Sequence, residues 1–390
     1  MSERFLSIRN RRINRSKFRV WLTSIRAIFA TRINLCGLGG SRDHGTAIDM
    51  LPDDVLVEIF DACRMNETGL KPWKWKWARL VHVCRRWRQI VLSYLNVQLF
   101  CTHGTLVAKK LACWPTLPIA LEYGSHIYED HLLAALEYPD RIRRIEFWAL
   151  NLRTGKVAKA MQKPCPALTH LILRSGPLSA HTIPHGFLGG SAPRLQEIAL
   201  TWITFLELPT LLLKAHALVN LEVSKMPWNG FLSPEKIIKS VATATRLQSL
   251  RIGYSKSCIL HVNLTPLTHH LPPITRTVLP SLTSLRLEGA RDFLEDFVAR
   301  VDVPRLRSID MTYLHQNDLR VPELLHLLME RSEGACLSQF NRAGITLHGD
   351  QSTFHAYPRH EANSQFSSLK ISISGSGKKR CASHMIQFHL

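Results

Sequence analysis

The sequence predicts an α+β protein in which a small helical module is followed by an irregular α/β solenoid. Apolar residues recur at spacings of three and four between residues 49 and 95, and a short apolar frame recurs beyond residue 105. The chain has 390 residues, 45% of them apolar, so it can bury a sizeable core and is not a collagen, a disulfide miniprotein or a fully disordered chain. We expect a basic, disordered extension (1–48), the helical module (49–100), the solenoid (105–376) and a tail (377–390).

The charge of the chain is strongly positive and unevenly distributed. Lys and Arg number 50 against 30 Asp and Glu, a net charge of +20, which suits nucleic acid, an anionic membrane or an acidic protein as partner. The first fifty residues are the most basic part and include one apolar helical face, formed by Trp21, Ile25, Ile28 and Phe29. Three interpretations stay open for residues 1–35: a mitochondrial-type transit peptide, a nuclear or membrane-surface arm, and a dispensable extension, which we favour.

Catalytic and metal-binding patterns are missing from the sequence. The nine cysteines form no CxxC pair and the 19 histidines show no ligand spacing, which predicts free thiols in a reducing compartment and no zinc site. There is no HExxH or GxSxG, and GSGKKR (375–380) lacks the Ser or Thr that would complete a phosphate-binding loop. No apolar run is long enough to span a membrane. We therefore expect no enzyme activity, no cofactor and no membrane span.

Residues 49–95 carry two amphipathic helical patterns. Pro52 stands at the start of the first pattern with Asp53 and Asp54 behind it, which are helix-entry signals. The second pattern runs from residue 77 to residue 95, with Trp77, Leu80, Val81, Cys84, Trp87, Ile90 and Val91 on one side. Two short helices cannot bury both apolar faces on one another, which indicates a module that docks on a partner.

The two blocks LPDDVLVEIF (51–60) and LVHVCRRWRQIV (80–91) resemble an F-box in order and spacing. The stretch KPWKWKWAR (71–79) enlarges the loop between the blocks, and Asn96 replaces the usual proline near the end. The resemblance implies a three-helix module that binds the Skp-type adaptor of a cullin-RING (SCF-type) ubiquitin ligase. The adaptor-binding residues it implies are Leu51, Pro52, Val55, Leu56, Ile59, Phe60, Leu80, Val83, Cys84, Trp87 and Ile90.

The frame LxxLxL recurs seven times between residues 141 and 313, at steps of 23 to 35 residues, and approximately once more at 368–376. Short strands separated by longer return segments are typical of leucine-rich-repeat-like solenoids, and the frames resemble the irregular repeats common behind F-boxes. Two return segments, 233–245 and 294–301, have helical patterns. The frames are RIRRIEFWA (141–149), ALTHLILRS (167–175), RLQEIALTW (194–202), ALVNLEVSK (217–225), RLQSLRIGY (246–254), SLTSLRLEG (281–289), RLRSIDMTY (305–313) and SLKISISGS (368–376).

The period of a strand assigns the frame residues to two faces. The last two apolar positions of each frame point inward and form the core: Ile145, Phe147, Leu171, Leu173, Ile198, Leu200, Leu221, Val223, Leu250, Ile252, Leu285, Leu287, Ile309 and Met311. The outward positions are Glu146, Trp148, Ile172, Arg174, Thr201, Glu222, Arg251, Arg286, Glu288 and Asp310.

We predict that six outward residues bind a target protein: Trp148, Ile172, Glu222, Arg251, Arg286 and Glu288. Two alternatives stay open for the arginine pair. Arg251 and Arg286 could grip an acidic or phosphorylated segment, or they could be solvated or paired with Glu222 and Glu288.

The sequence therefore favours an F-box substrate receptor in the cytoplasm or nucleus that holds an unidentified protein target beside a cullin-RING ligase. The alternative is a basic nucleic-acid- or chromatin-associated interaction protein with a vestigial F-box, although nucleic acid is not the partner we expect. Salt dependence separates the two, because phosphate binding weakens steeply with salt whereas docking through apolar side chains does not.

Overall fold

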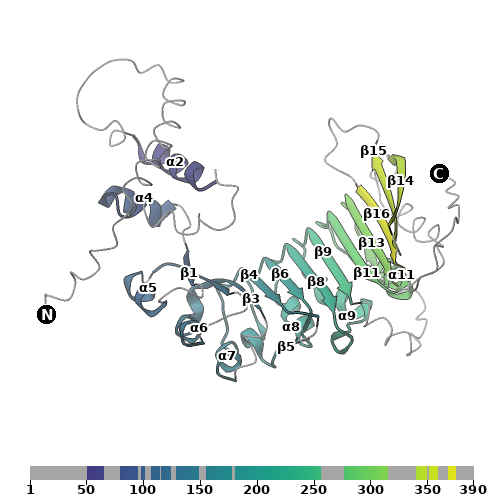
Figure 1. Cartoon of the computed structure of the whole chain (residues 1–390), viewed down its shortest axis with the longest axis horizontal. Helices are drawn as coiled ribbons and strands as arrows, with labels where there is room; N and C mark the ends of the chain where they lie inside the picture. The colour runs from purple at the N-terminus through teal and green to yellow at the C-terminus, as the bar shows by residue number, and fades with distance from the viewer. Residues whose placement is uncertain are drawn as a thin grey trace, which may run out of the picture. The chain divides into compact units, whose positions relative to one another are not determined.

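The computed structural model shows a protein of mixed helix and strand with a large parallel sheet (Figure 1). It describes residues 51–65, 80–94, 98–101, 107–114, 116–123, 129–148, 155–177, 181–255, 276–314, 340–348, 351–358 and 368–374. The predictions for residues 1–50, for the loop 71–79 and for the tail 377–390 lie outside these ranges. Within them, no helix is long and apolar enough to cross a membrane.

The chain divides into two compact units, residues 1–97 and residues 98–390. The first unit contains helices α2 (Asp53–Met65) and α4 (Arg85–Tyr94), and the expected helix entry after Pro52 is confirmed. The second pattern is interrupted, since residues 81–84 leave the helix before α4 begins. There the backbone N–H of Trp87 donates to Sγ of Cys84 at 3.4 Å, so the cysteine side chain caps the start of α4. Leu99 and Phe100, placed by the sequence at the end of the helical module, belong to the second unit.

A twelve-stranded sheet forms the second unit, in the order β1-β2-β3-β4-β6-β8-β9-β11-β13-β16-β15-β14. The strands pair in parallel from β1 to β16, and β16, β15 and β14 pair antiparallel. Their bounds are β1 (Leu99–Cys101), β2 (Ile119–Tyr123), β3 (Ile142–Trp148), β4 (His170–Arg174), β6 (Glu197–Thr201), β8 (Asn220–Met226), β9 (Ser249–Tyr254), β11 (Ser284–Gly289), β13 (Ser308–Leu314), β14 (Phe340–His348), β15 (Gln351–Pro358) and β16 (Ser368–Ser374).

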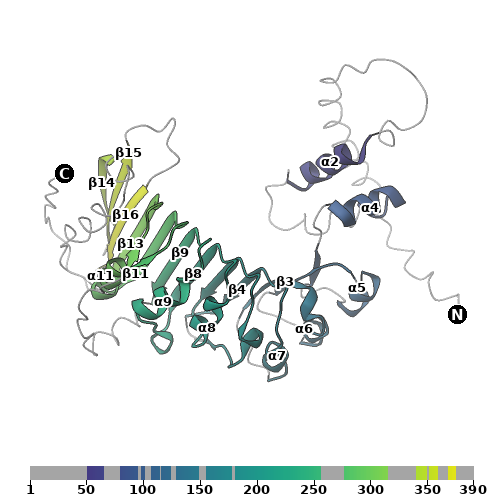
Figure 2. The ribbon, with the colours of Figure 1, turned by 180° about the vertical axis from the view of Figure 1, so that it is seen from behind.

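Two two-stranded sheets and a row of short helices fill the return segments. β5 (His181–Thr182) pairs with β7 (Ile203–Thr204), and β10 (Thr277–Val278) pairs with β12 (Val301–Asp302). Figures 1 and 2 show the helices along one side of the sheet, where α5, α6 and α7 contact one another in sequence, as do α8, α9 and α11. They are α5 (Val107–Cys113), α6 (Glu129–Leu136), α7 (Gly155–Ala160), α8 (Leu208–Leu213), α9 (Pro234–Val241) and α11 (Arg291–Arg300).

Each predicted frame forms a strand of the large sheet, and neighbouring frames pair in parallel. The two helical return segments are confirmed as α9 and α11, and α9 starts with Ser233 as its cap and Pro234 in its first turn. The LxxLxL frame did not predict the turn that directly precedes six of these strands. In each, the N–H of the first frame residue donates to the carbonyl three residues earlier: Leu168 to Cys165, Leu195 to Ala192, Leu218 to Ala215, Leu247 to Ala244, Leu282 to Leu279 and Leu306 to Val303.

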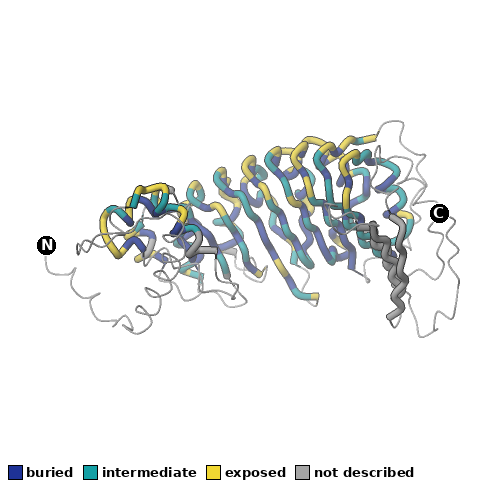
Figure 3. The backbone as a smooth tube through the Cα atoms, turned by 90° about the horizontal axis from the view of Figure 1, so that it is seen from above, coloured by how far each residue is buried: buried dark blue, intermediate teal, exposed yellow. Residues whose placement is uncertain are grey.

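All fourteen residues predicted to point inward are buried, so this core prediction is confirmed. They align across the sheet in two rows because the strands pair in one register, with Leu250 and Leu285 as partners in one row and Ile252 and Leu287 in the other. Figure 3 shows the result as buried residues alternating with partly exposed ones along the strands. Burying two apolar residues per strand supplies the main driving force for stacking one strand on the next.

The sheet extends beyond the predicted frames at both ends. β1 and β2 precede the first frame, and their residues Leu99, Cys101, Ile119 and Leu121 are all fully buried. At the other end β14 and β15 form an antiparallel pair that joins the sheet through β16. Gly349 and Asp350 between the two strand sequences are a hairpin signal, and these strands do not follow the LxxLxL frame.

Candidate functional site

The face of the sheet opposite the inward apolar rows carries three rows of mainly polar residues. The middle row runs across the strands through register partners that include Glu122, Glu146, Ile172, Ala199, Glu222, Arg251, Arg286 and Asp310. We call this surface the outward face. Its residues come from strands about 5 Å apart, so side chains on neighbouring strands can contact one another directly.

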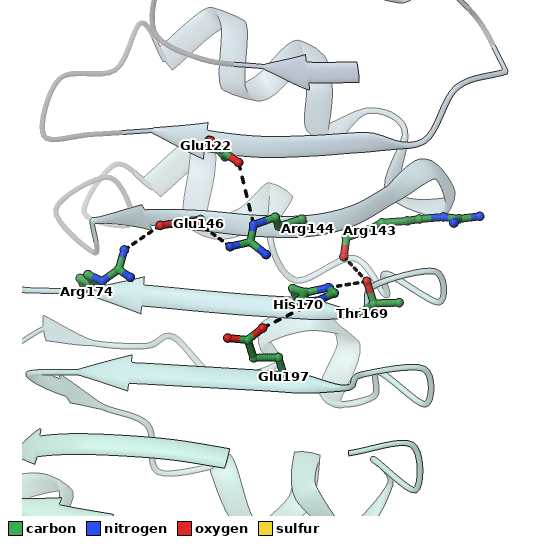
Figure 4. Close-up of polar contacts among 8 residues, drawn as sticks. All are labelled: Glu122, Arg143, Arg144, Glu146, Thr169, His170, Arg174 and Glu197. Atoms are coloured by element: carbon green, nitrogen blue, oxygen red, sulfur yellow. Dashed lines mark hydrogen bonds and ion pairs between the residues drawn. The ribbon is translucent and has the colours of Figure 1, made fainter. Parts of the chain in front are cut away.

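On β2, β3 and β4 the outward face carries a chain of four ion-paired residues (Figure 4). Arg144 lies 3.9 Å from Glu122 and donates to Glu146 at 2.8 Å. Arg174 donates to the other oxygen of Glu146 at 2.7 Å. The two ends of this series of ion pairs differ in exposure: the side chain of Glu122 is 14% exposed and that of Arg174 is 48% exposed. The acidic end is thus largely buried and the basic end faces solvent.

The two arginines set the protonation of Glu146. Partial burial alone would raise the pKa of this carboxyl, but the hydrogen bonds from Arg174 and Arg144 outweigh burial, and the pKa lies below its usual value. Beside the chain, His170 lies 3.6 Å from Glu197 and contacts the hydroxyl of Thr169 at 2.8 Å. Burial and the charge of Arg144 lower the pKa of His170 against the opposing effect of Glu197, so this imidazole is neutral at pH 7.

Between β8 and β13 the charges of the outward face form closed pairs instead of a chain. Arg251 contacts Glu222 at 3.1 Å, and Arg286 contacts Asp310 at 3.1 Å. Although Arg251 and Arg286 are register partners on adjacent strands, each turns to an acid on its far side. The structure therefore gives both arginines carboxylate partners, one of the two alternatives that the sequence left open, with Asp310 in place of Glu288 as the partner of Arg286.

Glu288 pairs with Lys225 at 2.5 Å, across the strand that lies between them. That strand, β9, places Gly253 beneath the pair, where a Cβ atom would lie 3.3 Å from the Glu288 carboxylate. Lys225 also has a left-handed backbone (φ 55°), which is uncommon for a residue with a side chain. The absence of a side chain at Gly253 leaves room for this pair to close.

The six predicted target-binding residues differ in accessibility. Trp148 is exposed, and Glu222, Arg251, Arg286 and Glu288 are partly exposed. Ile172 is 5% exposed, so the prediction that it lies open to a target is wrong. Its strand neighbour Arg174 and its register partner Glu146 are ion-paired beside it, and long side chains of this kind cover a central aliphatic residue.

The residues implied as adaptor-binding fall into two groups in the first unit. Six are buried: Leu56, Ile59, Phe60, Leu80, Trp87 and Ile90. Five are exposed or partly exposed: Leu51, Pro52, Val55, Val83 and Cys84. Part of each apolar face is therefore covered within the protein, with the rings of Phe60 and Trp87 4.7 Å apart, and part of each stays accessible.

Arg86 joins the two helices of this unit. Its guanidinium donates to the Asp53 carboxylate at 2.6 and 2.8 Å and to the backbone carbonyl of Leu51. Because Arg86 lies in the first turn of α4, this clamp brings the start of α2 next to the turn that precedes α4. Leu51 and Pro52 at the start of α2, and Val83 and Cys84 just before Arg86, are accessible residues that flank this contact, and we call these four residues the clamp surface.

Sequence reasoning missed several residues of the outward face, including Glu122, Arg144, His170, Glu197 and Lys225. Arg144 and His170 stand two positions before the predicted outward residues Glu146 and Ile172, and Glu197 stands four positions before Thr201. Extending the alternation toward the start of each strand would therefore have found them. Nothing in the local sequence pattern marks the contact of Arg86 with residues more than thirty positions away.

Among the described residues, no group of three or more His, Cys, Asp or Glu side chains could hold a metal ion. The chemistry that the two surfaces offer is ion pairing, hydrogen bonding and apolar contact. No protein-family model, no curated protein and no solved structure matches this chain, so the functional argument rests on its own residues.

Proposed function

We propose that this chain is the F-box substrate-recognition subunit of an SCF-type ubiquitin ligase. Its first unit docks on a Skp-type adaptor through the clamp surface, and its sheet presents a target protein. Ubiquitin transfer takes place on other subunits, and this chain contributes by holding the target beside them, which raises the effective concentration of the target lysine.

The observation that carries the proposal is the arrangement of the two motif blocks. They are separated by about twenty residues of chain, yet Arg86 of the second block binds Leu51 and Asp53 at the start of the first. The accessible apolar residues Leu51, Pro52, Val83 and Cys84 lie in sequence within three residues of the groups that make this contact. A motif whose blocks were similar by chance would have no reason to join its two blocks at this point.

The second unit supports the proposed leucine-rich-repeat-like solenoid. Successive frames form parallel neighbours in one sheet, the same turn enters six of the strands, and the helices of the return segments lie on one side. In such an architecture each repeat contacts mainly its neighbours, so the outward face forms one continuous surface. A continuous surface of fixed side chains suits the capture of a target at low entropic cost.

Adaptor binding by the full-length chain tests the proposal. We expect the Leu51→Ala, Pro52→Ala double variant to lose at least tenfold in adaptor affinity, because truncating an apolar anchor at an interface typically costs about 2 kcal/mol or more. The matched control is Leu206→Ala, Leu213→Ala, which removes two exposed apolar side chains from the second unit and leaves adaptor binding unchanged. Wild-type affinity in the clamp-surface variant would contradict the proposal.

Salt dependence provides an independent readout. Docking through Leu51, Pro52 and Val83 should change little between low and moderate salt, whereas a protein that binds through several phosphate contacts loses orders of magnitude in affinity. Failure to bind the adaptor together with tight, salt-sensitive binding of RNA or DNA would favour the alternative of a nucleic-acid-associated protein.

A further inference from the structure

Among the sheet residues whose burial the structure describes, which lie on β1 to β13, the outward face has one exposed large apolar side chain, Trp148. The side chains of this class that are exposed elsewhere, such as Leu206 and Val278, lie outside that sheet. Trp148 is the last residue of β3, and its register partner is Arg174, the last residue of β4. An aromatic side chain and an arginine therefore stand side by side, about 5 Å apart, where the two strands end.

Arg174 differs from the other paired cations of the outward face. With a side-chain exposure of 48%, it is more accessible than Arg144 (28%), Arg251 (33%), Lys225 (39%) or Arg286 (43%). It also ends an ion-pair chain, and its partner Glu146 is shared with Arg144. A guanidinium has five N–H donors, and a carboxylate that also binds a second arginine does not accept from all of them. A second carboxylate could therefore bind Arg174 and extend the chain.

The charge around this pair limits what can bind there. Among the side chains that the structure describes on β2 to β13, the ion pairs join six carboxylates to five Lys or Arg cations and one histidine. In the nearest group, three carboxylates (Glu122, Glu146 and Glu197) face two arginines. A polyphosphate backbone or a doubly charged phosphate would be repelled by these acids, whereas a single carboxylate adds one charge that Arg174 compensates.

Resting on the proposed function, we infer that Trp148 and Arg174 capture the target by binding a peptide segment with an apolar side chain close to an Asp or Glu. The apolar side chain packs on the Trp148 indole, and the carboxylate accepts hydrogen bonds from Arg174. Trp and Arg are the residue types that most often carry binding energy at interfaces. This places the target site near the N-terminal end of the sheet, away from the Arg251 and Arg286 pair.

Selection of displayed random short peptides on the immobilised full-length chain tests the inference. We expect enriched peptides to share an aromatic or aliphatic residue within two positions of Asp or Glu. An enriched peptide should bind Arg174→Gln and Trp148→Ala at least tenfold more weakly than wild type. The affinity of Arg174→Lys should lie between those of wild type and Arg174→Gln, because lysine keeps the positive charge but loses the planar guanidinium that binds a carboxylate with two hydrogen bonds. The matched control is Arg286→Gln, which removes an outward arginine of similar exposure and should change affinity by less than about twofold.

Each other outcome has a defined meaning. No enrichment, enrichment without an acidic residue, or a larger loss in Arg286→Gln than in Arg174→Gln would overturn the inference. Tighter binding of a phosphoserine version of the peptide or of an oligonucleotide, lost in Arg174→Gln, would overturn the carboxylate as the recognised group. A cooperative melting transition in each variant, shifted by no more than the loss of one partly exposed ion pair would cause, excludes misfolding as the cause.

Adaptor binding measured on the same preparations separates this inference from the proposed function. A chain that binds the adaptor but no acidic peptide contradicts the inference alone. A chain that binds acidic peptides through Arg174 but no adaptor contradicts the proposed function alone.

Discussion

The helical unit and the sheet use their apolar residues in different ways. In the sheet, each strand separates its residues by alternation, so apolar side chains such as Leu250 and Ile252 lie in the core and Arg251 between them lies on the outward face. In the helical unit, the apolar residues of one motif divide between core and surface, with Phe60 and Trp87 buried and Pro52 and Val83 exposed. In the sheet the period alone assigns a residue to the core, whereas the motif of the helical unit does not show which of its residues could contact a partner.

This difference follows from the geometry of the two elements. A strand has two faces, so one apolar position fixes the orientation of every other residue. A helix has a continuous surface, and an apolar stripe more than 100° wide can cover a neighbouring helix with its centre while its margins stay accessible. Burial in the helical unit therefore depends on how α2 and α4 meet, where Arg86 contacts Leu51 and Asp53 and Phe60 packs on Trp87.

The largest expected effect comes from removing a core side chain of the helical unit. Trp87 is 5% exposed and packs on Phe60, so Trp87→Ala should destabilise the unit by about 3–5 kcal/mol. Hydrogen exchange of the full-length chain should show lost protection in both α2 and α4, together with lost adaptor binding. Pro52→Ala is the control and keeps protection in both helices. Full protection in Trp87→Ala would show that Trp87 is a surface residue of the unit.

A neighbouring pair of substitutions tests alternation in the sheet. Leu250→Ala removes a side chain that is 1% exposed and should cost about 2–5 kcal/mol. Arg251→Ala, one position along the same strand, should cost less than about 1 kcal/mol because it removes a partly exposed ion pair. Urea unfolding of both variants measures the contrast, and equal losses would contradict the assignment of the two faces.

The sequence was sufficient for the strands of the predicted frames, the inward rows and the helices α2, α9 and α11, because each depends on a local period or on local helix-entry signals. The pairing of side chains was beyond it. From the sequence, Glu288 and Asp310 are equally suitable partners for Arg286. Which carboxylate Arg286 contacts depends on side-chain geometry across parallel strands. The burial of Ile172 depends in the same way on an ion pair between two other strand residues, Glu146 and Arg174.

A smaller effect is expected where one cation joins the two motif blocks. Arg86→Gln removes the hydrogen bonds to Asp53 and to the carbonyl of Leu51. Because the Arg86 side chain is 38% exposed, solvent screening limits the cost to about 1 kcal/mol. Hydrogen exchange should show faster exchange in the first turn of α2 with the rest of the helix protected, and adaptor affinity should fall although no apolar residue has changed. Arg88→Gln, which removes a hydrogen bond to Val81 within the second block, is the control that keeps adaptor affinity.

The smallest expected effect is the pH dependence of the ion-pair chain on the outward face. The pKa of Glu146 is lowered in the folded state, so ionised Glu146 stabilises the fold above its ordinary pKa of 4.5, and this stability is lost as the pH falls through the lowered value. The gain is less than about 1 kcal/mol, since the pair partner Arg174 is half exposed. Melting temperatures of wild type and Glu146→Gln should therefore differ at pH 7 and converge below the ordinary pKa.

Arg174→Gln removes one of the two donors while Arg144 remains, so its melting temperature at pH 7 should lie between those of wild type and Glu146→Gln. A constant difference between wild type and Glu146→Gln from pH 7 down to acid conditions would show that Glu146 contributes by packing and that its charge is not what holds Arg144 and Arg174.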